Sequence, residues 1–310
     1  MISIFKTISG RLDRIDDFEP GCWVNLVAPT AAEVSQVADR YGIAADYLTD
    51  SLDADERARV EVEDDAIIMV VRAPMPNEKN PQVPFTTLPI GIIIAPDAII
   101  TICAAEGDLV TFLLNGKVRA LDTGKRMRLA IQLLQKVALT YLSDLRAINR
   151  KSEAIERELQ KSMRNKELLE LFSIEKSLVY FITSLKANDI IMEKLRSSRL
   201  VHLSEDEMDL LEDAIIENRQ AIGMTTIYTD ILSGLMDAFA SVINNNMNTV
   251  MKMLTGVTIV LMIPNIITGA YGMNIDVPLH DSPYAFMFVV GSSLLLCCLA
   301  WLLFTKKRWM

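Results

Sequence analysis

The sequence is poor in the residues that usually build catalytic and metal centres. It has only 2 histidines and 4 cysteines in 310 residues. The cysteines, Cys22, Cys103, Cys297 and Cys298, fit neither a disulfide framework nor a zinc site. Residues 1–120 contain no glycine-rich phosphate loop and no Ser/His/Asp set. The sequence therefore predicts a protein that is not an enzyme.

Positive charge is also scarce. The chain carries 31 Lys and Arg against 40 Asp and Glu, a net charge of −9. A surface of that sign repels nucleic acid and attracts cations, so no nucleic-acid partner is expected. The first residues lack the apolar core of a signal peptide, which predicts that the start of the chain stays in the cytosol.

Charged residues are absent from two runs near the C-terminal end, Leu254–Ala270 and Tyr284–Phe304. The second run has 21 residues, enough to cross a hydrocarbon core of about 30 Å. The first extends to Val250 if the Lys252 ammonium reaches the interface. We therefore predict transmembrane helices over 250–270 and 284–304.

The basic residues predict the orientation of these spans. Lys252 precedes the first span, and Lys306, Lys307 and Arg308 follow the second within a basic tail, 305–310. The link 271–283 contains no Lys or Arg. The positive-inside rule places both termini in the cytoplasm and the link outside.

A stripe of polar, small and Met residues runs along the first span and the segment before it. Steps of 4 and 3 residues alternately meet Asp237, Ser241, Asn244, Asn248, Met251, Thr255, Thr258, Met262, Asn265, Gly269 and Gly272, here called the polar stripe. An average step of 3.5 residues keeps these positions on one face of a supercoiled helix. Such a face is costly against lipid, so it either lines water inside a homo-oligomeric pore or forms a dry helix interface. Pro264 breaks the hydrogen-bond ladder and frees a carbonyl one turn earlier.

Tyr271-Gly272-Met273-Asn274, a short link, a second span and a terminal Lys-Lys-Arg-Trp together resemble the signature of the CorA family of divalent-cation channels. The preceding "NNNMNTVMKMLTGVTIVLMIPNIITGAYGMN" is similar to the pore helix of that family. The resemblance implies a homopentamer in the lipid bilayer. Each subunit would have a cytoplasmic α/β domain, a long stalk helix that becomes the inner span, and an outer span.

The resemblance also implies which residues meet the ion. The external mouth would be formed by Gly272, Met273, Asn274 and Asp276. By position the pore face of the family matches Asn274, Gly272, Gly269, Asn265, Met262, Met251, Asn248 and Asp237, and the polar stripe adds Asn244, Thr255 and Thr258.

Amide oxygens suit an ion such as Mg²⁺ that keeps its water shell, and this is the role expected of Asn274. Asp276 either concentrates cations or is an ordinary loop residue. Met262 and Met251 would form apolar constrictions that close by dewetting.

One departure from the family leaves the identity of the transported ion undecided. The family often has a Pro-x-Thr arrangement where this chain has Ile263-Pro264-Asn265. We expect transport of Mg²⁺ through a bacterial inner membrane, with Co²⁺, Ni²⁺ or Zn²⁺ as the alternative cargo. A membrane-anchored coiled-coil scaffold or sensor without a pore is the alternative from another class.

The part before the membrane reads as an α/β domain with a β core over 1–120 and a helical stalk over 121–249. Strand-like runs are "WVNLVAP", "DAIIMVVRAP", "IGIIIAP" and "AIITICA", and prolines at 81 and 84 mark a loop between two strands. Thr30 with Glu33 forms a capping box for a helix that Gly42 ends. Helical patterns cover 125–163, 166–200 and, from the Ser204 cap with Glu207, a rod to Gly269 of roughly 100 Å.

Acidic residues before the membrane suggest regulation by cytosolic Mg²⁺ held between subunits. The resemblance makes Asp213 the first candidate, with Asp53 or Asp55 supplied by a neighbour. The alternative is a solvated acidic face without a bound ion.

Overall fold

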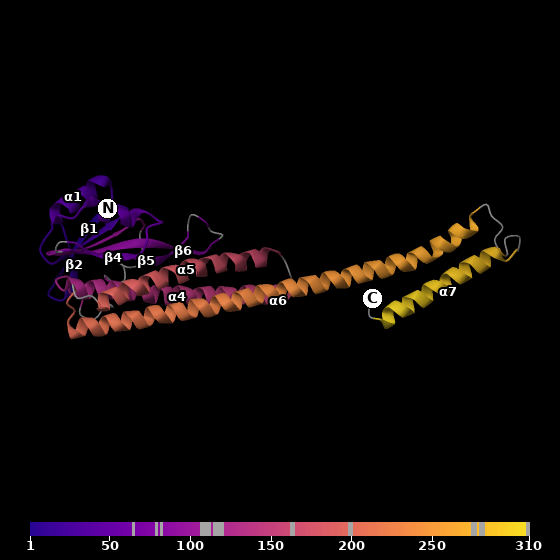
Figure 1. The fold of residues 1–310 in the computed structure, drawn as a ribbon. Coiled ribbons are helices and arrows are strands. Elements are labelled where there is room, and N and C mark those ends of the chain that lie inside the picture. The colour runs from indigo at the N-terminus through magenta and orange to yellow at the C-terminus, as the bar shows by residue number, and fades with distance from the viewer. Residues whose placement is uncertain are drawn as a thin grey trace. The chain divides into compact units, whose positions relative to one another are not determined.

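A computed structural model of the protein is shown in Figure 1. It describes residues 1–63, 66–77, 80, 83–105, 113, 121–161, 165–197, 201–273, 278 and 283–307. The chain divides into two compact units, Met1–Gly234 and Leu235–Met310.

The first unit is built on a seven-stranded sheet with the strand order β2-β1-β3-β7-β6-β5-β4. The strands are β1 (Ile2–Ile8), β2 (Arg11–Ile15), β3 (Cys22–Val27), β4 (Arg59–Glu63), β5 (Ala66–Pro76), β6 (Phe85–Ile94) and β7 (Ala98–Cys103). The four predicted strand runs are confirmed as β3, β5, β6 and β7. The pairing of β5 with β6 also confirms the predicted loop between two strands. β3 and β7 form the parallel pair at the centre, and the other pairs are antiparallel.

Short helices cover one face of this sheet: α1 (Ala31–Tyr41), α2 (Ala45–Thr49) and the 3₁₀ turn η1 (Asp50–Leu52). The predicted capping box of α1 is present, because the Glu33 amide donates to Thr30 Oγ1 and the Thr30 amide donates to Glu33 Oε2. Gly42 ends α1 with a positive φ of 66°, which its missing side chain permits. Val34 and Val37 of α1 pack into the apolar core on this face.

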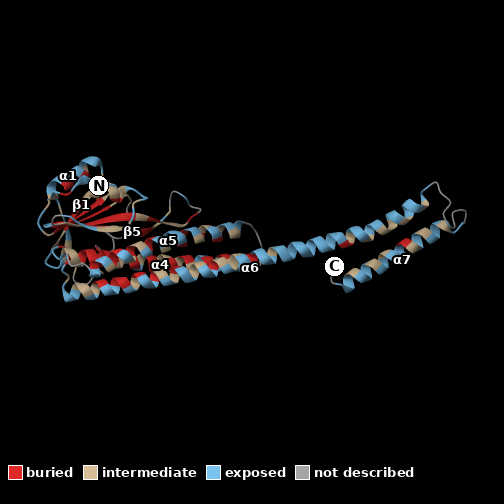
Figure 2. Ribbon diagram, in the orientation of Figure 1, coloured by how far each residue is buried: buried red, intermediate tan, exposed pale blue. Residues whose placement is uncertain are grey.

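Two long helices cover the opposite face: α4 (Arg126–Lys161) and α5 (Asn165–Ser197). Figure 2 shows buried residues on the sheet and on parts of these helices. Tyr141 of α4 is fully buried, and its hydroxyl donates to the Arg72 carbonyl oxygen at 3.0 Å. Burial raises the pKa of this phenol, so it remains a neutral donor.

The longest element is α6 (Glu205–Tyr271), a single helix of 67 residues. It begins as predicted, because the Ser204 amide donates to Glu207 Oε2 at 3.0 Å and the Glu207 amide donates to Ser204 Oγ at 3.4 Å. Its early turns are tied to α5 by Asn218, whose Nδ2 donates to the Leu185 carbonyl oxygen at 3.0 Å. The helix continues through Pro264 to its end.

An ion pair adds to the contact between α6 and α5. The Arg219 guanidinium lies 3.2 Å from Asp189 and 2.5 Å from Glu193. These two carboxylates raise the pKa of Arg219. The early turns of α6 therefore belong to the helical layer of the first unit.

The second unit contains the rest of α6 and α7 (Ala285–Lys306). Among the residues that the structure describes, two helices, α6 and α7, are long and apolar enough to cross a membrane. The second predicted span, 284–304, nearly coincides with α7.

Candidate ion pathway

One side of α6 is partly covered in the second unit. Gly256 is buried, and Val260, Ile263 and Ile267 are half-buried, at spacings of 4, 3 and 4 residues. The most buried residue of α7 is Ser293. Small residues such as Gly256 and Ser293 let two helices approach closely.

One hydrogen bond between the two helices involves a carbonyl that Pro264 leaves without its helical partner. A proline has no amide hydrogen, so the Val260 carbonyl oxygen one turn earlier receives no bond from position 264. Cys297 of α7 donates its thiol to that oxygen at 3.4 Å. The freed carbonyl that the sequence predicts is therefore satisfied from the neighbouring helix.

The polar stripe lies on the part of α6 that α7 leaves uncovered. All eleven of its positions are exposed: Asp237, Ser241, Asn244, Asn248, Met251, Thr255, Thr258, Met262, Asn265, Gly269 and Gly272. The apolar Leu254, Leu261 and Ile266 are exposed as well, because one helix covers only one side of another. In a single chain the stripe is thus one open face of one helix, and further copies would be needed to enclose it.

The two threonines of the stripe turn their hydroxyl hydrogens toward their own helix. Thr255 Oγ1 donates to the Met251 carbonyl oxygen and Thr258 Oγ1 to that of Leu254, each at 2.8 Å. Once its hydrogen is used in this way, a hydroxyl presents lone pairs to its surroundings. Such oxygens can accept hydrogen bonds from the water shell of a cation.

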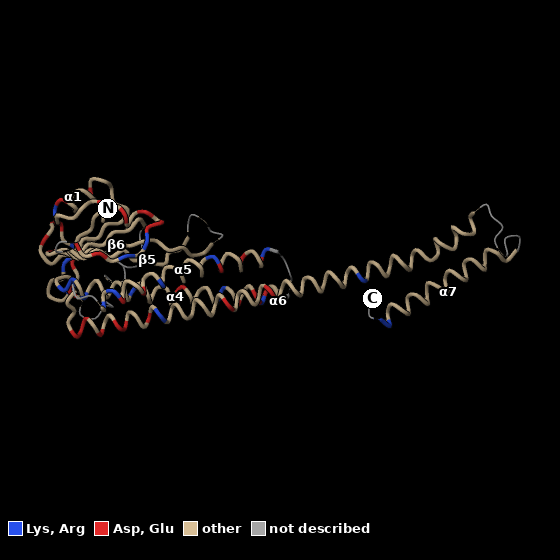
Figure 3. Tube along the Cα trace, in the orientation of Figure 1, with Lys and Arg blue, Asp and Glu red and all other residues tan. Residues whose placement is uncertain are grey.

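Fixed charge is missing from the described part of this region. Between Lys252 and Lys306 none of the residues that the structure describes is charged (Figure 3). Beyond Lys252, a pathway along the stripe would therefore contact an ion through neutral oxygens and Met side chains. Neutral oxygens bind a hydrated divalent ion more weakly than carboxylates do. Weak binding lets the ion leave each site again, as conduction requires.

The predicted mouth begins at the end of α6. The Gly272 amide donates to the Thr268 carbonyl oxygen at 2.9 Å, so the last turn closes on this residue. Met273 follows with 57% of its surface exposed. The Tyr271 hydroxyl donates to the Pro278 carbonyl oxygen at 3.1 Å. Two predicted mouth residues, Asn274 and Asp276, lie outside the described residues.

The predicted regulatory carboxylates lie in the first unit. Asp213 is exposed on α6, and Asp53 follows η1, where its Oδ1 accepts from the Asp55 amide at 3.0 Å. Among the described residues, no three His, Cys, Asp or Glu side chains are grouped closely enough to hold a metal ion. A regulatory site that needs a neighbouring chain stays a prediction.

Sequence reasoning missed the Cys297 contact, although Pro264 signals a free carbonyl. No pattern in the sequence says which donor reaches it. The pairing depends on how α7 packs, which the sequence does not specify.

The sequence matches the family described as CorA-like Mg²⁺ transporter protein over residues 19–308. A cobalt/magnesium transport protein CorA from Methanocaldococcus jannaschii is 26% identical over 314 residues, which cover 97% of this chain and 96% of that protein. The protein of the same description from Thermotoga maritima is 21% identical, with 93% and 83% covered.

Solved structures agree with this match. The complete structure of the CorA magnesium transporter from Methanocaldococcus jannaschii superposes with a TM-score of 0.86 at 25% identity, covering 100% of this chain and 99% of that one. The full-length CmaX protein shares the fold, with a TM-score of 0.72 at 17% identity and coverage of 99% and 97%. From the family match and the fold together, we conclude that the chain belongs to the CorA-like Mg²⁺ transporter family.

Proposed function

We propose that the protein is a homopentameric channel that passes Mg²⁺ through a bacterial inner membrane down its electrochemical gradient. The observation that carries the proposal is the polar stripe, eleven exposed positions on the side of α6 that α7 does not cover. The relatives named above are described as cobalt/magnesium transport proteins, which supports a divalent cation as the cargo.

In this proposal residues 250–270 and 284–304 cross the membrane, and the link 271–283 lies outside. The domain 1–120, the stalk 121–249 and the tail 305–310 lie in the cytoplasm. The membrane potential supplies about 2.3 kcal/mol per charge per 100 mV, so a divalent ion needs no other energy source to enter.

Ions would meet successive rings of side chains along the stripe. Rings of Asn265, Asn248 and Asn244 amides accept hydrogen bonds from the water shell, so the ion moves without losing its tightly held water. Rings of Met262 and Met251 form apolar constrictions that close the path by dewetting when the helices approach. Conduction then depends on small changes in the diameter of these rings.

Exposed apolar side chains in the first unit support association with further copies. On α5 and α6 they are Leu169, Phe172, Val179, Tyr180, Ile190, Ile216, Ile227 and Ile231. Burying one such side chain against a neighbour stabilises an assembly by about 1.5–3 kcal/mol. The number five comes from the family resemblance.

The preference for one cation over another should depend on Asn265, where this chain departs from the family. Asn265 offers an amide where a hydroxyl is common in the family, which changes the size and donor content of a ring in the middle of the span. Co²⁺, Ni²⁺ or Zn²⁺ is the alternative cargo, to be separated from Mg²⁺ by competition.

Regulation is proposed at Asp213, with Asp53 or Asp55 of a neighbouring subunit. Bound Mg²⁺ would neutralise the repulsion of these carboxylates and hold the closed state. Asp213→Lys should shift the Mg²⁺ concentration at which flux is inhibited. Unchanged inhibition would reject this site.

The test is ion flux in liposomes that contain the purified protein. We expect Mg²⁺ entry that rises with an inside-negative potential and falls strongly in Asn274→Ala and Asn265→Ala. Asn149→Ala, at a half-buried position of α4 in the first unit, is the control and should leave flux unchanged. No flux, or flux insensitive to both Asn274→Ala and Asn265→Ala, would favour a scaffold or sensor without a pore.

A further inference from the structure

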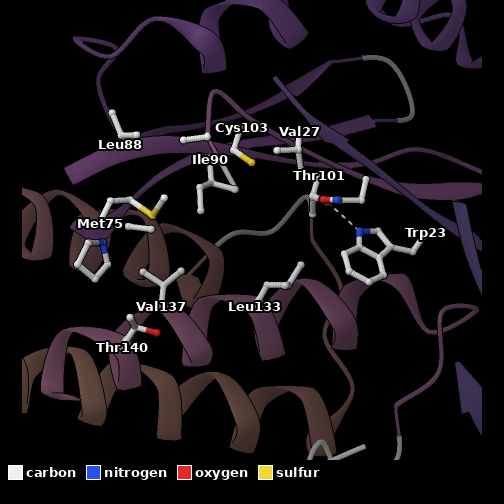
Figure 4. A pocket seen from close by; sticks show the side chains of 14 residues that line it. Trp23, Val27, Met75, Leu88, Ile90, Thr101, Cys103, Leu133, Val137 and Thr140 are labelled. Atoms are coloured by element: carbon white, nitrogen blue, oxygen red, sulfur yellow. Dashed lines mark hydrogen bonds between the residues drawn. The ribbon is translucent and has the colours of Figure 1, made fainter. Parts of the chain in front are cut away.

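Two hollows of the first unit differ in what they could hold. The one between the sheet and α4 measures about 50 Å³, room for no more than a few water molecules, and is lined mainly by apolar side chains such as Met75 and Val137 (Figure 4). Polar groups in its wall already bond to one another, since the Trp23 indole donates to Thr101 Oγ1 at 2.8 Å. The second hollow, of about 320 Å³, has room for a small ligand.

This second hollow lies where α1 and α2 meet strands β4 and β5, and it is partly open to solvent. Its apolar part consists of Ile43 and Ile68, which are 8% and 1% exposed, together with the more exposed Ala66 and Pro96. Such side chains suit the alkyl groups of a ligand, because alkyl surface gains free energy when it leaves water.

Aromatic and acidic side chains complete the wall. Tyr41 and Tyr47 are half-buried and pack against the apolar core. The Tyr47 hydroxyl donates to Glu63 Oε2, which holds the carboxylate beside the phenol. A carboxylate has about four lone-pair sites, so this bond leaves Glu63 able to accept further donors. Among the described residues that line the hollow, Glu63 is the only one that carries a charge.

The end of helix α1 adds negative potential at the same place. The helix ends at Tyr41 and Gly42 follows as its C-cap, so its last carbonyl groups lie next to the hollow. The carbonyl end of a helix carries a partial negative charge and favours cations. Arg40, the basic residue of that last turn, does not line the hollow, and its guanidinium donates to the Phe18 carbonyl oxygen at 3.5 Å.

We propose that this hollow binds a small organic ammonium ion whose nitrogen carries alkyl groups. The charge would lie between the two tyrosine side chains and the Glu63 carboxylate, and the alkyl groups against Ile43 and Ile68. Aromatic rings attract cations, and proteins recognise quaternary ammonium groups in this way. Because Glu63 is exposed, we expect a modest affinity.

A bare metal ion fits this hollow less well than an organic cation does. A divalent metal ion takes several oxygen ligands, and the described wall offers a single carboxylate. Among the described residues, no three His, Cys, Asp or Glu side chains are grouped closely enough to hold a metal ion. The ligand is therefore distinct from the cargo of the proposed ion pathway.

The experiment compares two probes of nearly equal shape, choline and 3,3-dimethylbutan-1-ol, in which a carbon atom replaces the charged nitrogen. The full chain is kept in dodecyl maltoside, a detergent without an ammonium group, and dialysis sets the concentration of free probe. The ¹³C-labelled δ1 methyl group of Ile43, assigned with an Ile43→Val sample, reports on the hollow. We expect a saturable shift with choline and about tenfold weaker binding of the neutral probe, which lacks the charge.

Three variants separate the charge from the space. Glu63→Gln should weaken choline binding about three- to fivefold and leave the neutral probe unchanged. Glu61→Gln makes the same change on the same strand, at a residue that does not line the hollow, and should leave both probes unchanged. Ala66→Leu narrows the hollow and should weaken both probes. Added MgCl₂ should displace no more choline than NaCl of equal ionic strength does.

The proposal fails if choline gives no saturable shift, if the two probes bind equally, or if the choline response is unchanged in Ala66→Leu. It also fails if Glu63→Gln has no more effect on choline than Glu61→Gln, or if Mg²⁺ displaces choline specifically. None of these measurements involves ion flux, so their failure leaves the proposed transport function untouched.

Discussion

The thiol of Cys297 stands in for the amide hydrogen that Pro264 lacks. It reaches the Val260 carbonyl oxygen at 3.4 Å. Cys297→Val removes the donor at nearly constant volume and should destabilise the packing of α7 on α6 by about 0.5–1 kcal/mol, the scale of such bonds between membrane helices. Cys297→Ser keeps a donor and should cost less. Unfolding in mixed micelles measures the differences.

Two comparisons make this prediction specific. Cys298→Val alters the exposed neighbouring thiol and should have no comparable effect. In a Pro264→Ala background the new amide can pair with Val260, so the cost of Cys297→Val should shrink. An undiminished cost would show that the thiol acts through packing alone.

Asn188 completes the hydrogen bonding of β5 where β4 stops. The β4 ladder ends at the Arg59–Val70 pair, two residues before Arg72. Asn188 of α5 accepts from the Arg72 amide at 3.0 Å and donates to the Arg72 carbonyl oxygen at 2.8 Å. A side chain from the helix thus takes the place of a strand neighbour.

Asn188→Leu should therefore destabilise the first unit. The Arg72 amide would lose its partner beneath a helix, at a cost of about 2–3 kcal/mol, while the carbonyl keeps its bond from Tyr141. Thermal unfolding of the full chain measures the loss. Asn149→Leu, at a half-buried position of α4 where the amide bonds to the Glu153 side chain, is the control, and an equal loss in both variants would contradict the assigned role.

The polar stripe predicts which positions of α6 contact water. If one face of the helix is wet, water-accessible positions must recur about every 3.5 residues. In a chain whose four native cysteines are replaced, single cysteines at Thr258, Met262 and Asn265 should react with a water-soluble thiol reagent. Cysteines at Leu261 and Ile266 should react about tenfold more slowly, since a thiolate does not form in lipid.

The same scan distinguishes the pore from the dry interface. A dry interface would protect all five positions. Reaction without the repeat would mean that no single face of α6 is wet. Only fast reaction confined to the stripe supports a pore.

Assembly of the whole protein should depend on apolar side chains that a single chain leaves exposed. Ile227 on α6 is 56% exposed. Ile227→Asp would bury an unpaired charge between subunits and should therefore lower the fraction of pentamer. Native mass spectrometry measures that fraction, because a pentamer has five times the chain mass of 34.7 kDa. Thr226→Asp, at the exposed position beside it, is the control. A pentamer unaffected by either change would place the interface elsewhere.

Strand prediction succeeded where the chain is continuously apolar. β3, β5, β6 and β7 are buried strands of the sheet, and their apolar runs mark them clearly. β1, β2 and β4 were missed. β2 and β4 are short edge strands rich in charge, "RLDRI" and "RVEVE", and an exposed edge needs no apolar run. Pairing with a neighbour, which a local pattern cannot reveal, makes them strands.

The sequence by itself determined the features that depend on near neighbours in the chain. The caps of α1 and α6, the length of α6, the apolar character of α7 and the spacing of the polar stripe all follow from residues a few positions apart. Helical periodicity and local hydrogen bonds are enough to specify them.

Only the tertiary structure decided which distant groups meet. It placed β7 parallel to β3, Asn188 against Arg72, and Cys297 against the carbonyl that Pro264 frees. Each of these contacts joins residues at least 37 positions apart, because packing of whole elements, rather than the order of neighbouring residues, brings such groups together.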